Sequence, residues 1–153
     1  MPSSYTQSYF HLVFGTHQRQ PWIDERLHDR LYAFIGGIAR DLGKGQSGQL
    51  VAGNGARDHV HLLVRCPPDV SLAELAREVE ARSSKWIHET FPDLRRFAWQ
   101  RGYGGFTVSR SQIEDVEKYI RTQDEHHKVM TFQDEFRAML EKHGVAFDPR
   151  YLE

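Results

Sequence analysis

The chain has 153 residues, of which 39% are hydrophobic and 27% are charged. This composition excludes a disordered or collagen-like chain and predicts one domain over residues 1–153. A single cysteine, Cys66, excludes an internal disulfide and a multi-cysteine zinc site, and the net charge of −1 excludes a strong field that would attract nucleic acid to the whole surface. Because neither a membrane-length apolar run nor a signal-peptide pattern is visible, we expect a cytoplasmic protein that makes no membrane contact.

The first half of the chain predicts a strand, a helix and two further strands. Aromatic and β-branched residues favour the first strand, and Pro21 and Asp24 precede a helix with apolar residues at helical spacing. A glycine-rich turn separates that helix from the next strand, and Gly53-Asn54-Gly55 is expected to close it. The predicted ranges are 8–14 for the first strand, about 25–42 for the helix, and 49–52 and 59–64 for the later strands.

The second half predicts helices and short extended segments. Ser71 with Glu74, and Ser111 with Glu114, each have the spacing of a capping box, in which the two residues satisfy the first backbone amides of a helix. Thr131 is expected to begin the last helix, which ends near Gly144. The predicted ranges are 71–90, 111–126 and 131–144 for the helices, and 97–99 and 105–109 for the extended segments.

The order of these elements predicts an α+β fold of the ferredoxin-like, split β-α-β type. Such a fold has an antiparallel sheet with helices on one face, followed here by C-terminal helices that carry Tyr119. We expect the other face of the sheet to be open to a ligand, although the fold alone does not identify that ligand.

The most informative segment is the strand with two histidines. His59 and His61 are two residues apart, so their side chains share a face, with Cα atoms about 6.5–7 Å apart. Two imidazoles at this spacing can bind one cation. The alternative is an exposed histidine pair on a half-buried strand, and a metal site needs a third protein ligand.

The helix after Ser111 offers such a ligand. Tyr119 and Gln123 are four residues apart and therefore lie on the same face of that helix. If the helix crosses the face that carries the histidines, Gln123 can offer an amide oxygen to the ion and Tyr119 a phenol beside it. Ordinarily, such a tyrosine borders the core and such a glutamine is solvated.

Several segments together resemble a known family. The chain is similar to the single-tyrosine transposases of bacterial insertion sequences, the IS200-like members of the HUH nuclease superfamily. The similarity extends over nearly the whole chain, and it is carried by residues 58–64, 83–86, 102–109 and 119–127 and by the tail from Phe132 to Leu152. One departure is His17, which stands where relatives often have lysine.

The resemblance implies a DNA transposase that cleaves and rejoins single-stranded DNA with a divalent metal ion, Mg²⁺ or Mn²⁺. Tyr119 would be the nucleophile that forms a 5′-phosphotyrosine link, and His59, His61 and Gln123 would be the metal ligands. The resemblance also implies recognition of hairpins at the ends of the mobile element. Finally, it implies a homodimer whose active sites can be shared between subunits.

The middle of the chain is mildly basic, and a subset of its cations is expected to contact DNA phosphates. These candidates are Lys85, Arg95, Arg96, Arg101 and Arg110. We expect His11 to be a boundary residue of its strand, and His126 and His127 to cap the tyrosine helix. Two alternatives remain: a domesticated, repeat-associated relative that no longer moves, and a non-catalytic module that binds single-stranded nucleic acid.

Overall fold

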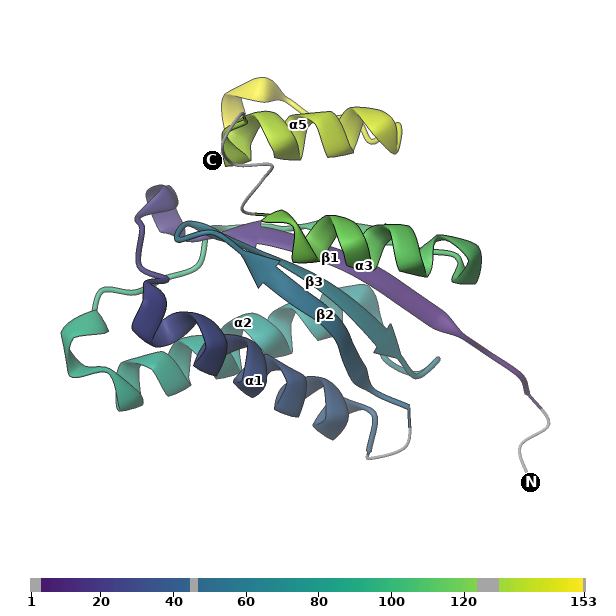
Figure 1. Ribbon diagram of the computed structural model, residues 1–153, viewed down its shortest axis with the longest axis horizontal. Coiled ribbons are helices and arrows are strands. Elements are labelled where there is room, and N and C mark those ends of the chain that lie inside the picture. The colour runs from purple at the N-terminus through teal and green to yellow at the C-terminus, as the bar shows by residue number, and fades with distance from the viewer. Residues whose placement is uncertain (1–3, 45–46, 124–129, 153) are drawn as a thin grey trace.

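The computed structural model describes residues 4–44, 47–123 and 130–152. Its centre is a four-stranded sheet with the order β2-β3-β1-β4, in which every pairing is antiparallel (Figure 1). The strands are β1 (Ser8–Gly15), β2 (Gln49–Gly55), β3 (His59–Cys66) and β4 (Gly104–Thr107). This topology confirms the predicted α+β, ferredoxin-like class.

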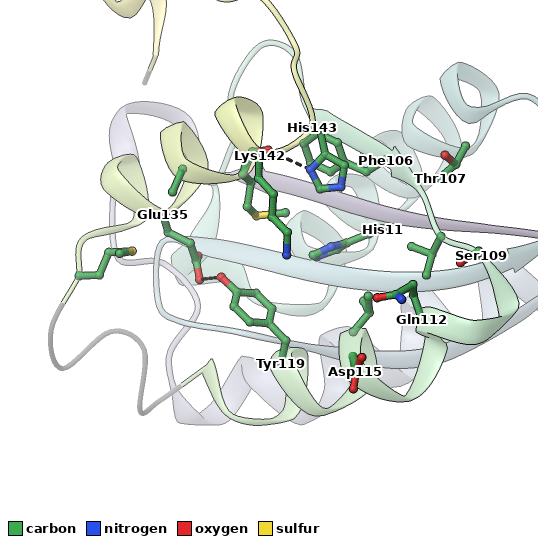
Figure 2. Close-up of a pocket in the computed structure, with 15 residues that line it drawn as sticks. His11, Phe106, Thr107, Ser109, Gln112, Asp115, Tyr119, Glu135, Lys142 and His143 are labelled. Atoms are coloured by element: carbon green, nitrogen blue, oxygen red, sulfur yellow. Dashed lines mark hydrogen bonds between the residues drawn. The ribbon is translucent and has the colours of Figure 1, made fainter.

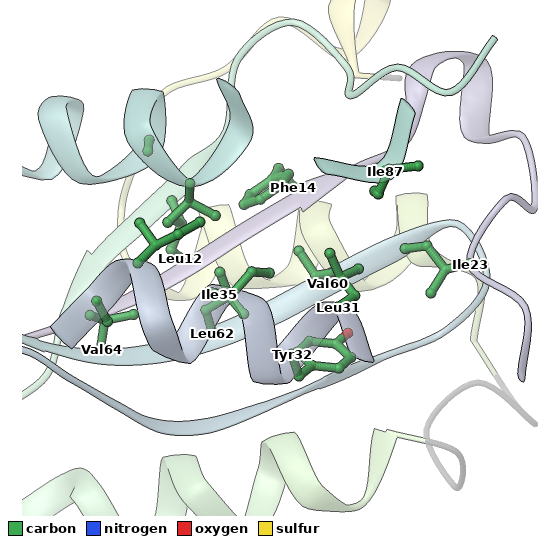
Figure 3. Close-up of a cluster of buried hydrophobic side chains, with 14 of the residues drawn as sticks. Leu12, Phe14, Ile23, Leu31, Tyr32, Ile35, Val60, Leu62, Val64 and Ile87 are labelled. Atoms are coloured by element: carbon green, nitrogen blue, oxygen red, sulfur yellow. The ribbon is translucent and has the colours of Figure 1, made fainter. Parts of the chain in front are cut away.

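Helices α1 (Glu25–Leu42) and α2 (Leu72–Thr90) pack on one face of the sheet. Each has the capping residue that its sequence predicts, because the side chain of Asp24 accepts from the amide of Leu27 and that of Ser71 accepts from the amide of Glu74. The apolar stripes of both helices meet every second residue of β1 and β3 in the main core (Figure 3). Val60 and Leu62 belong to this core.

The second face of the sheet is covered, so the expectation of an open platform was wrong. Helix α3 (Ile113–Arg121) packs on β2 and β3, and helix α5 (Phe132–Lys142) lies beside it over β1 and β4 (Figure 1). Each helix has an apolar side that requires burial, and the sheet provides the matching surface. A site on this face is therefore enclosed between the sheet and the two C-terminal helices.

Local differences from the predicted elements have simple causes. β2 continues through Gly55, because pairing with β3 outweighs the turn preference of glycine and asparagine. The Ser111 capping box was wrong: Ser111 lies inside a short 3-10 turn, and its hydroxyl contacts that of Ser109. The last helix begins after Thr131 as predicted, with the Thr131 hydroxyl accepting from the amide of Asp134 at 3.2 Å.

The other predicted ranges agree in part. In the predicted extended segment 97–99, Trp99 forms an isolated bridge to Thr16. The predicted segment 105–109 corresponds to β4, which begins one residue earlier and ends two residues earlier. The end of the predicted tyrosine helix, including His126 and His127, lies outside the described residues. Within the described ranges, none of the helices combines the length and apolar character required to cross a membrane.

Candidate active site

The two histidines of β3 point to the second face of the sheet, as their spacing predicts. Val60 and Leu62, between and after them, point to the main core. Both imidazoles are fully buried, with no exposed surface. The ring of Phe132, from α5, stacks on that of His59 with 4.2 Å between centroids. The histidine pair is therefore an interior feature and not the exposed pair of the alternative interpretation.

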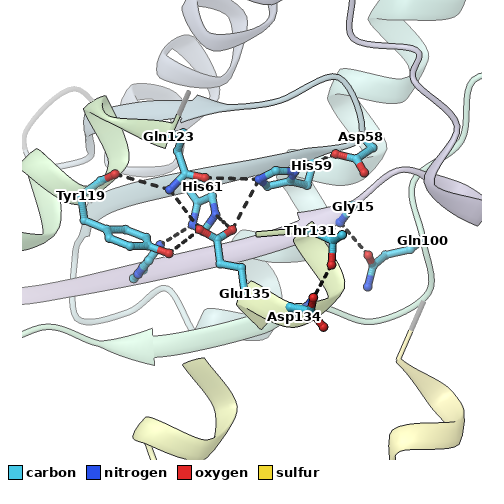
Figure 4. Close-up of polar contacts among 11 residues, drawn as sticks. Gly15, Asp58, His59, His61, Gln100, Tyr119, Gln123, Thr131, Asp134 and Glu135 are labelled. Atoms are coloured by element: carbon cyan, nitrogen blue, oxygen red, sulfur yellow. Dashed lines mark hydrogen bonds and ion pairs between the residues drawn. The ribbon is translucent and has the colours of Figure 1, made fainter. Parts of the chain in front are cut away.

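Side chains from three elements converge on the imidazoles (Figure 4). Glu135 Oε1 lies 2.8 Å from His61 Nε2 and 3.6 Å from His59 Nε2. Gln123 Oε1 lies 3.3 Å from His59 Nε2. The buried centre thus contains two ring nitrogens, a carboxylate and an amide oxygen, contributed by β3, α5 and the residues that follow α3.

Each imidazole is also held at its other nitrogen. Asp58 Oδ1 lies 2.8 Å from His59 Nδ1, and His11 Nε2 lies 2.9 Å from His61 Nδ1. These bonds orient the rings so that both Nε2 atoms face the shared centre, as the outer hydrogen bonds of metal-binding histidines do.

His11 is a residue of this centre that the sequence interpretation missed. It was expected at the boundary of its strand, but it is only 5% exposed. Burial, followed by the neighbouring His61, lowers the pKa of His11 to about 3. His11 is therefore neutral at physiological pH and can accept a hydrogen bond from His61. A signal for its burial existed in the sequence: His11 is two residues before Val13, so both side chains lie on the same face of β1.

Tyr119 lies at the edge of the same centre. Its hydroxyl donates a short hydrogen bond to Glu135 Oε2, and its ring centroid is 5.7 Å from that of His61. Burial and the hydrogen bond to Glu135 raise the pKa of the phenol well above its ordinary value, so the phenol is protonated at neutral pH. The side chain is half-buried, and it lines a cavity.

Glu135 is the second residue that the sequence interpretation missed. It is 2% exposed and bonds His61, Tyr119 and Gln123. Although burial opposes its ionisation, the bonds from His61 and Tyr119 lower the pKa of Glu135 to about 2. A signal existed: Glu135 falls three residues after Phe132, within the apolar stripe of its helix, where a carboxylate requires buried partners.

The donor set fits a divalent metal ion. One ligand atom from each of His59, His61 and Glu135 lies within 4.8 Å of the others. Gln123 adds an amide oxygen beside His59. Imidazole nitrogens with carboxylate and amide oxygens suit manganese or magnesium better than a thiol-preferring ion. Three side chains therefore present ligand atoms close to one another, and Gln123 lies next to them.

Two cavities flank the buried centre. One, of about 700 Å³, lies between α3, α5 and β4, with Tyr119 and Glu135 in its wall (Figure 2). Lys142 reaches into this cavity. It was not among the basic residues that the sequence predicted to contact DNA. The other, of about 870 Å³, lies on the Asp58 side and is lined by Arg19 and Arg57. The phenol therefore borders a cavity, whereas the side chains of His59 and His61 have no exposed surface.

The predicted basic residues are more scattered than the predicted ligands. All five are exposed. Lys85 lies on α2, across the sheet from the histidines, where its ammonium is 3.9 Å from Glu89. Arg110 lies in the turn directly before α3, on the side of the candidate site. His17 is exposed at the start of a short turn after β1.

Comparison with known proteins identifies the family of this chain. The family model described as "Transposase IS200 like" matches residues 4–123, which is most of the chain. The chain belongs to the IS200-like transposase family, and it is accordingly an enzyme of DNA transposition.

The individual relatives share less than a third of their residues with this chain. The transposase for insertion sequence element IS200 of Salmonella typhimurium is 28% identical over 126 residues, which cover 78% of this chain and 79% of the relative. A crystal structure of a candidate transposase from Deinococcus radiodurans has a TM-score of 0.65 at 23% identity, covering 80% of this chain and 95% of that one. A structure of a REP-associated tyrosine transposase bound to a REP hairpin has a TM-score of 0.60 at 15% identity, covering 83% and 73%. Both structural likenesses concern the fold.

Proposed function

We propose that this transposase cleaves and rejoins single-stranded DNA through a covalent 5′-phosphotyrosine link on Tyr119, with a divalent metal ion at His59 and His61. One observation carries the proposal. The two oxygens of Glu135 contact the phenol on one side and the imidazoles on the other. The carboxylate of Glu135 therefore lies directly between the proposed nucleophile, Tyr119, and the proposed metal ligands, His59 and His61.

The chemistry requires both parts. A phosphodiester carries charged oxygens that repel a nucleophile, and a bound divalent ion neutralises that charge and orients the phosphate. His59, His61 and Gln123 hold the ion in this proposal, with Glu135 as a further oxygen donor. Attack by Tyr119 on phosphorus releases a 3′-hydroxyl and leaves the 5′ side attached to the enzyme. The covalent link conserves the phosphodiester bond energy, so a second 3′-hydroxyl can rejoin the strand.

The proposed substrate is a single strand that carries a hairpin. The structural relative bound to a REP hairpin supports this assignment. The two cavities supply space for unpaired nucleotides on either side of the buried centre, and Lys142, Arg19 and Arg57 are available to phosphates there. Arg110, near α3, is the predicted basic residue best placed to extend this path.

We also propose that the enzyme is a homodimer and that manganese supports its activity at least as well as magnesium. Two imidazoles are softer ligands than magnesium usually takes, whereas manganese accepts them together with oxygens. Undiminished cleavage in the presence of a chelator would contradict the metal requirement.

The test is the formation of a denaturant-resistant protein–DNA adduct on hairpin-bearing single strands in Mn²⁺. We expect Tyr119→Phe to abolish the adduct and to preserve hairpin binding, because only the attacking oxygen is removed. Tyr5→Phe is the matched control, since the Tyr5 side chain is 96% exposed. An adduct that persists in Tyr119→Phe would assign the nucleophile to another residue, and binding without any adduct in the unmodified protein would favour the non-catalytic alternative.

A further inference from the structure

The carboxylate of Glu135 is placed for more than metal binding. Its two oxygens have different neighbours: Oε1 faces the imidazoles, whereas Oε2 accepts the hydrogen of the Tyr119 hydroxyl and the amide of Gln123 at 3.3 Å. Figure 4 shows the phenol and the carboxylate pointing toward each other from α3 and α5. The hydroxyl proton of the proposed nucleophile is thus already directed at a specific oxygen atom.

Attack by Tyr119 requires the loss of that proton. The amide nitrogen of Gln123 is a donor and cannot take it. His61 already contacts His11 through Nδ1 and Glu135 through Nε2, so its ring is engaged at both nitrogens. Glu135 Oε2 is in hydrogen-bond contact with the phenol and is a proton acceptor, which meets the geometric requirement for a general base.

We propose that Glu135 is a catalytic residue that accepts the proton of the Tyr119 hydroxyl during cleavage and returns it during rejoining. This inference rests on the proposed function. In cleavage, the O–H bond of Tyr119 breaks as an O–H bond forms on Glu135 Oε2. The Tyr119 oxygen bonds to phosphorus, the bond from phosphorus to the 3′-oxygen breaks, and that oxygen takes a proton from water.

Rejoining runs these steps in reverse. A 3′-hydroxyl gives its proton to water and bonds to phosphorus, and the bond from phosphorus to the Tyr119 oxygen breaks. The protonated Glu135 then donates its hydrogen to the departing phenolate. A single carboxyl group therefore serves both half-reactions, and the free tyrosine is restored without a further acid.

The experiment measures single-turnover adduct formation by Glu135→Gln on a hairpin-bearing single strand. Mn²⁺ is raised until the rate no longer changes, so that a weaker metal site is compensated. Glutamine keeps the size of the side chain but cannot accept the proton, and we expect the rate to fall about 10²–10⁴-fold. Glu141→Gln, on the exposed side of the same helix, is the matched control and is expected to retain the rate.

A second arm separates proton transfer from metal binding and folding. Replacing Tyr119 with a more acidic fluorinated tyrosine should recover part of the lost rate in the Glu135→Gln background, because a more acidic phenol depends less on a base. In the unsubstituted enzyme, adduct formation should be slower in heavy water than in ordinary water. This measurement applies even if Glu135→Gln does not fold.

An unchanged rate for Glu135→Gln at saturating Mn²⁺ would overturn the inference, as would the same rate in both waters or no recovery with the acidic tyrosine. These results leave the adduct of the unsubstituted enzyme intact. If the unsubstituted enzyme forms no adduct, the proposed function itself fails, and the inference fails with it.

Discussion

The hydrogen bonds behind the imidazoles decide how the candidate site is oriented. His11 holds His61 and Asp58 holds His59, each through Nδ1. The two partners differ in kind, because Asp58 offers a carboxyl oxygen whereas His11 offers a ring nitrogen that burial keeps neutral. The orientation of His61 therefore depends on a neutral partner that is itself buried.

This arrangement predicts the effect of His11→Ala. Without its outer hydrogen bond, His61 loses its fixed orientation, and we expect affinity for Mn²⁺ to fall about 10–100-fold. Calorimetric titration of the metal-free protein with Mn²⁺ measures the change. His88→Ala is the control, because His88 lies on α2 and bonds the backbone of Phe97. Equal affinity in the unsubstituted protein and His11→Ala would show that the hydrogen bond does not orient the ligand.

A second residue-scale prediction concerns Glu80 on α2. Its Oε1 is buried, with no hydrogen-bond partner among the described residues, and burial raises the pKa of Glu80 to about 7. A carboxyl with a raised pKa in the folded state binds its proton more tightly there than in the unfolded chain. The folded state is therefore penalised as pH rises from the ordinary value of about 4.5 through about 7.

We expect Glu80→Gln to stabilise the protein above pH 7 by about 1–2 kcal/mol, less than the full shift implies because the side chain is partly open to solvent. The gain should disappear below about pH 4, where the carboxyl is protonated in both the folded protein and the unfolded chain. Denaturant unfolding at several pH values measures this dependence. A gain that is constant across the range would mean that ionisation of Glu80 is not its cause.

At the scale of elements, α5 positions Glu135 and closes the site. Its apolar side packs on β1 and β4 in a cluster separate from the main core, with members Val13, Phe106, Phe132, Phe136, Met139 and Leu140. The helix approaches β4 closely at Gly104, where a Cβ atom would lie 2.4 Å from the ring of Phe136. Glycine at this position lets the aromatic ring rest against the strand.

Gly104→Ala should therefore displace α5. We expect a loss of about 1–3 kcal/mol in the free energy of unfolding, as for other overpacked sites, together with weaker Mn²⁺ binding because Glu135 moves with the helix. Gly37→Ala is the contrasting control: it lies in α1, where an added Cβ has room, and should stabilise the protein by up to about 1 kcal/mol. Unchanged stability and metal affinity in Gly104→Ala would show that α5 adapts without cost.

At the scale of the whole molecule, one chain brings the complete constellation together. β3 supplies the imidazoles, α3 the phenol and α5 the carboxylate, all on the same face of one sheet. The resemblance allowed a site shared between two subunits, but this geometry does not require a second copy. The proposed homodimer would then carry two self-sufficient sites.

This view makes a prediction about mixed proteins. Tyr119→Phe and His59→Ala should each be inactive, and a mixture of the two should stay inactive, because each chain lacks one part of its own site. Adduct formation by the mixture, compared with an equal amount of the unsubstituted protein, is the measurement. Recovery of activity on mixing would show that a phenol and an imidazole pair from different chains cooperate.

Much of the architecture was predictable, because it depends on local patterns. The stripe and capping residue of α1 predicted its bounds, and the alternation in β3 predicted that His59 and His61 share a face. Tyr119 and Gln123 were predicted from spacing and from family resemblance, and the structure brings both to the histidines. The Ser111 box failed because a short motif does not reveal which turn the neighbouring elements impose.

By itself, the sequence determined the class of fold and the family, and it indicated candidate residues for binding a cation and attacking a phosphate. Only the tertiary structure decided that the second face is covered, that His11 is buried behind His61, and that Glu135 joins the phenol to the imidazoles. The reason is physical. Periodicity reports which side of its own element a residue occupies, whereas the hydrogen-bond partners of Glu135 and His61 lie 12 to 74 positions away in the chain, selected by how the helices and strands pack.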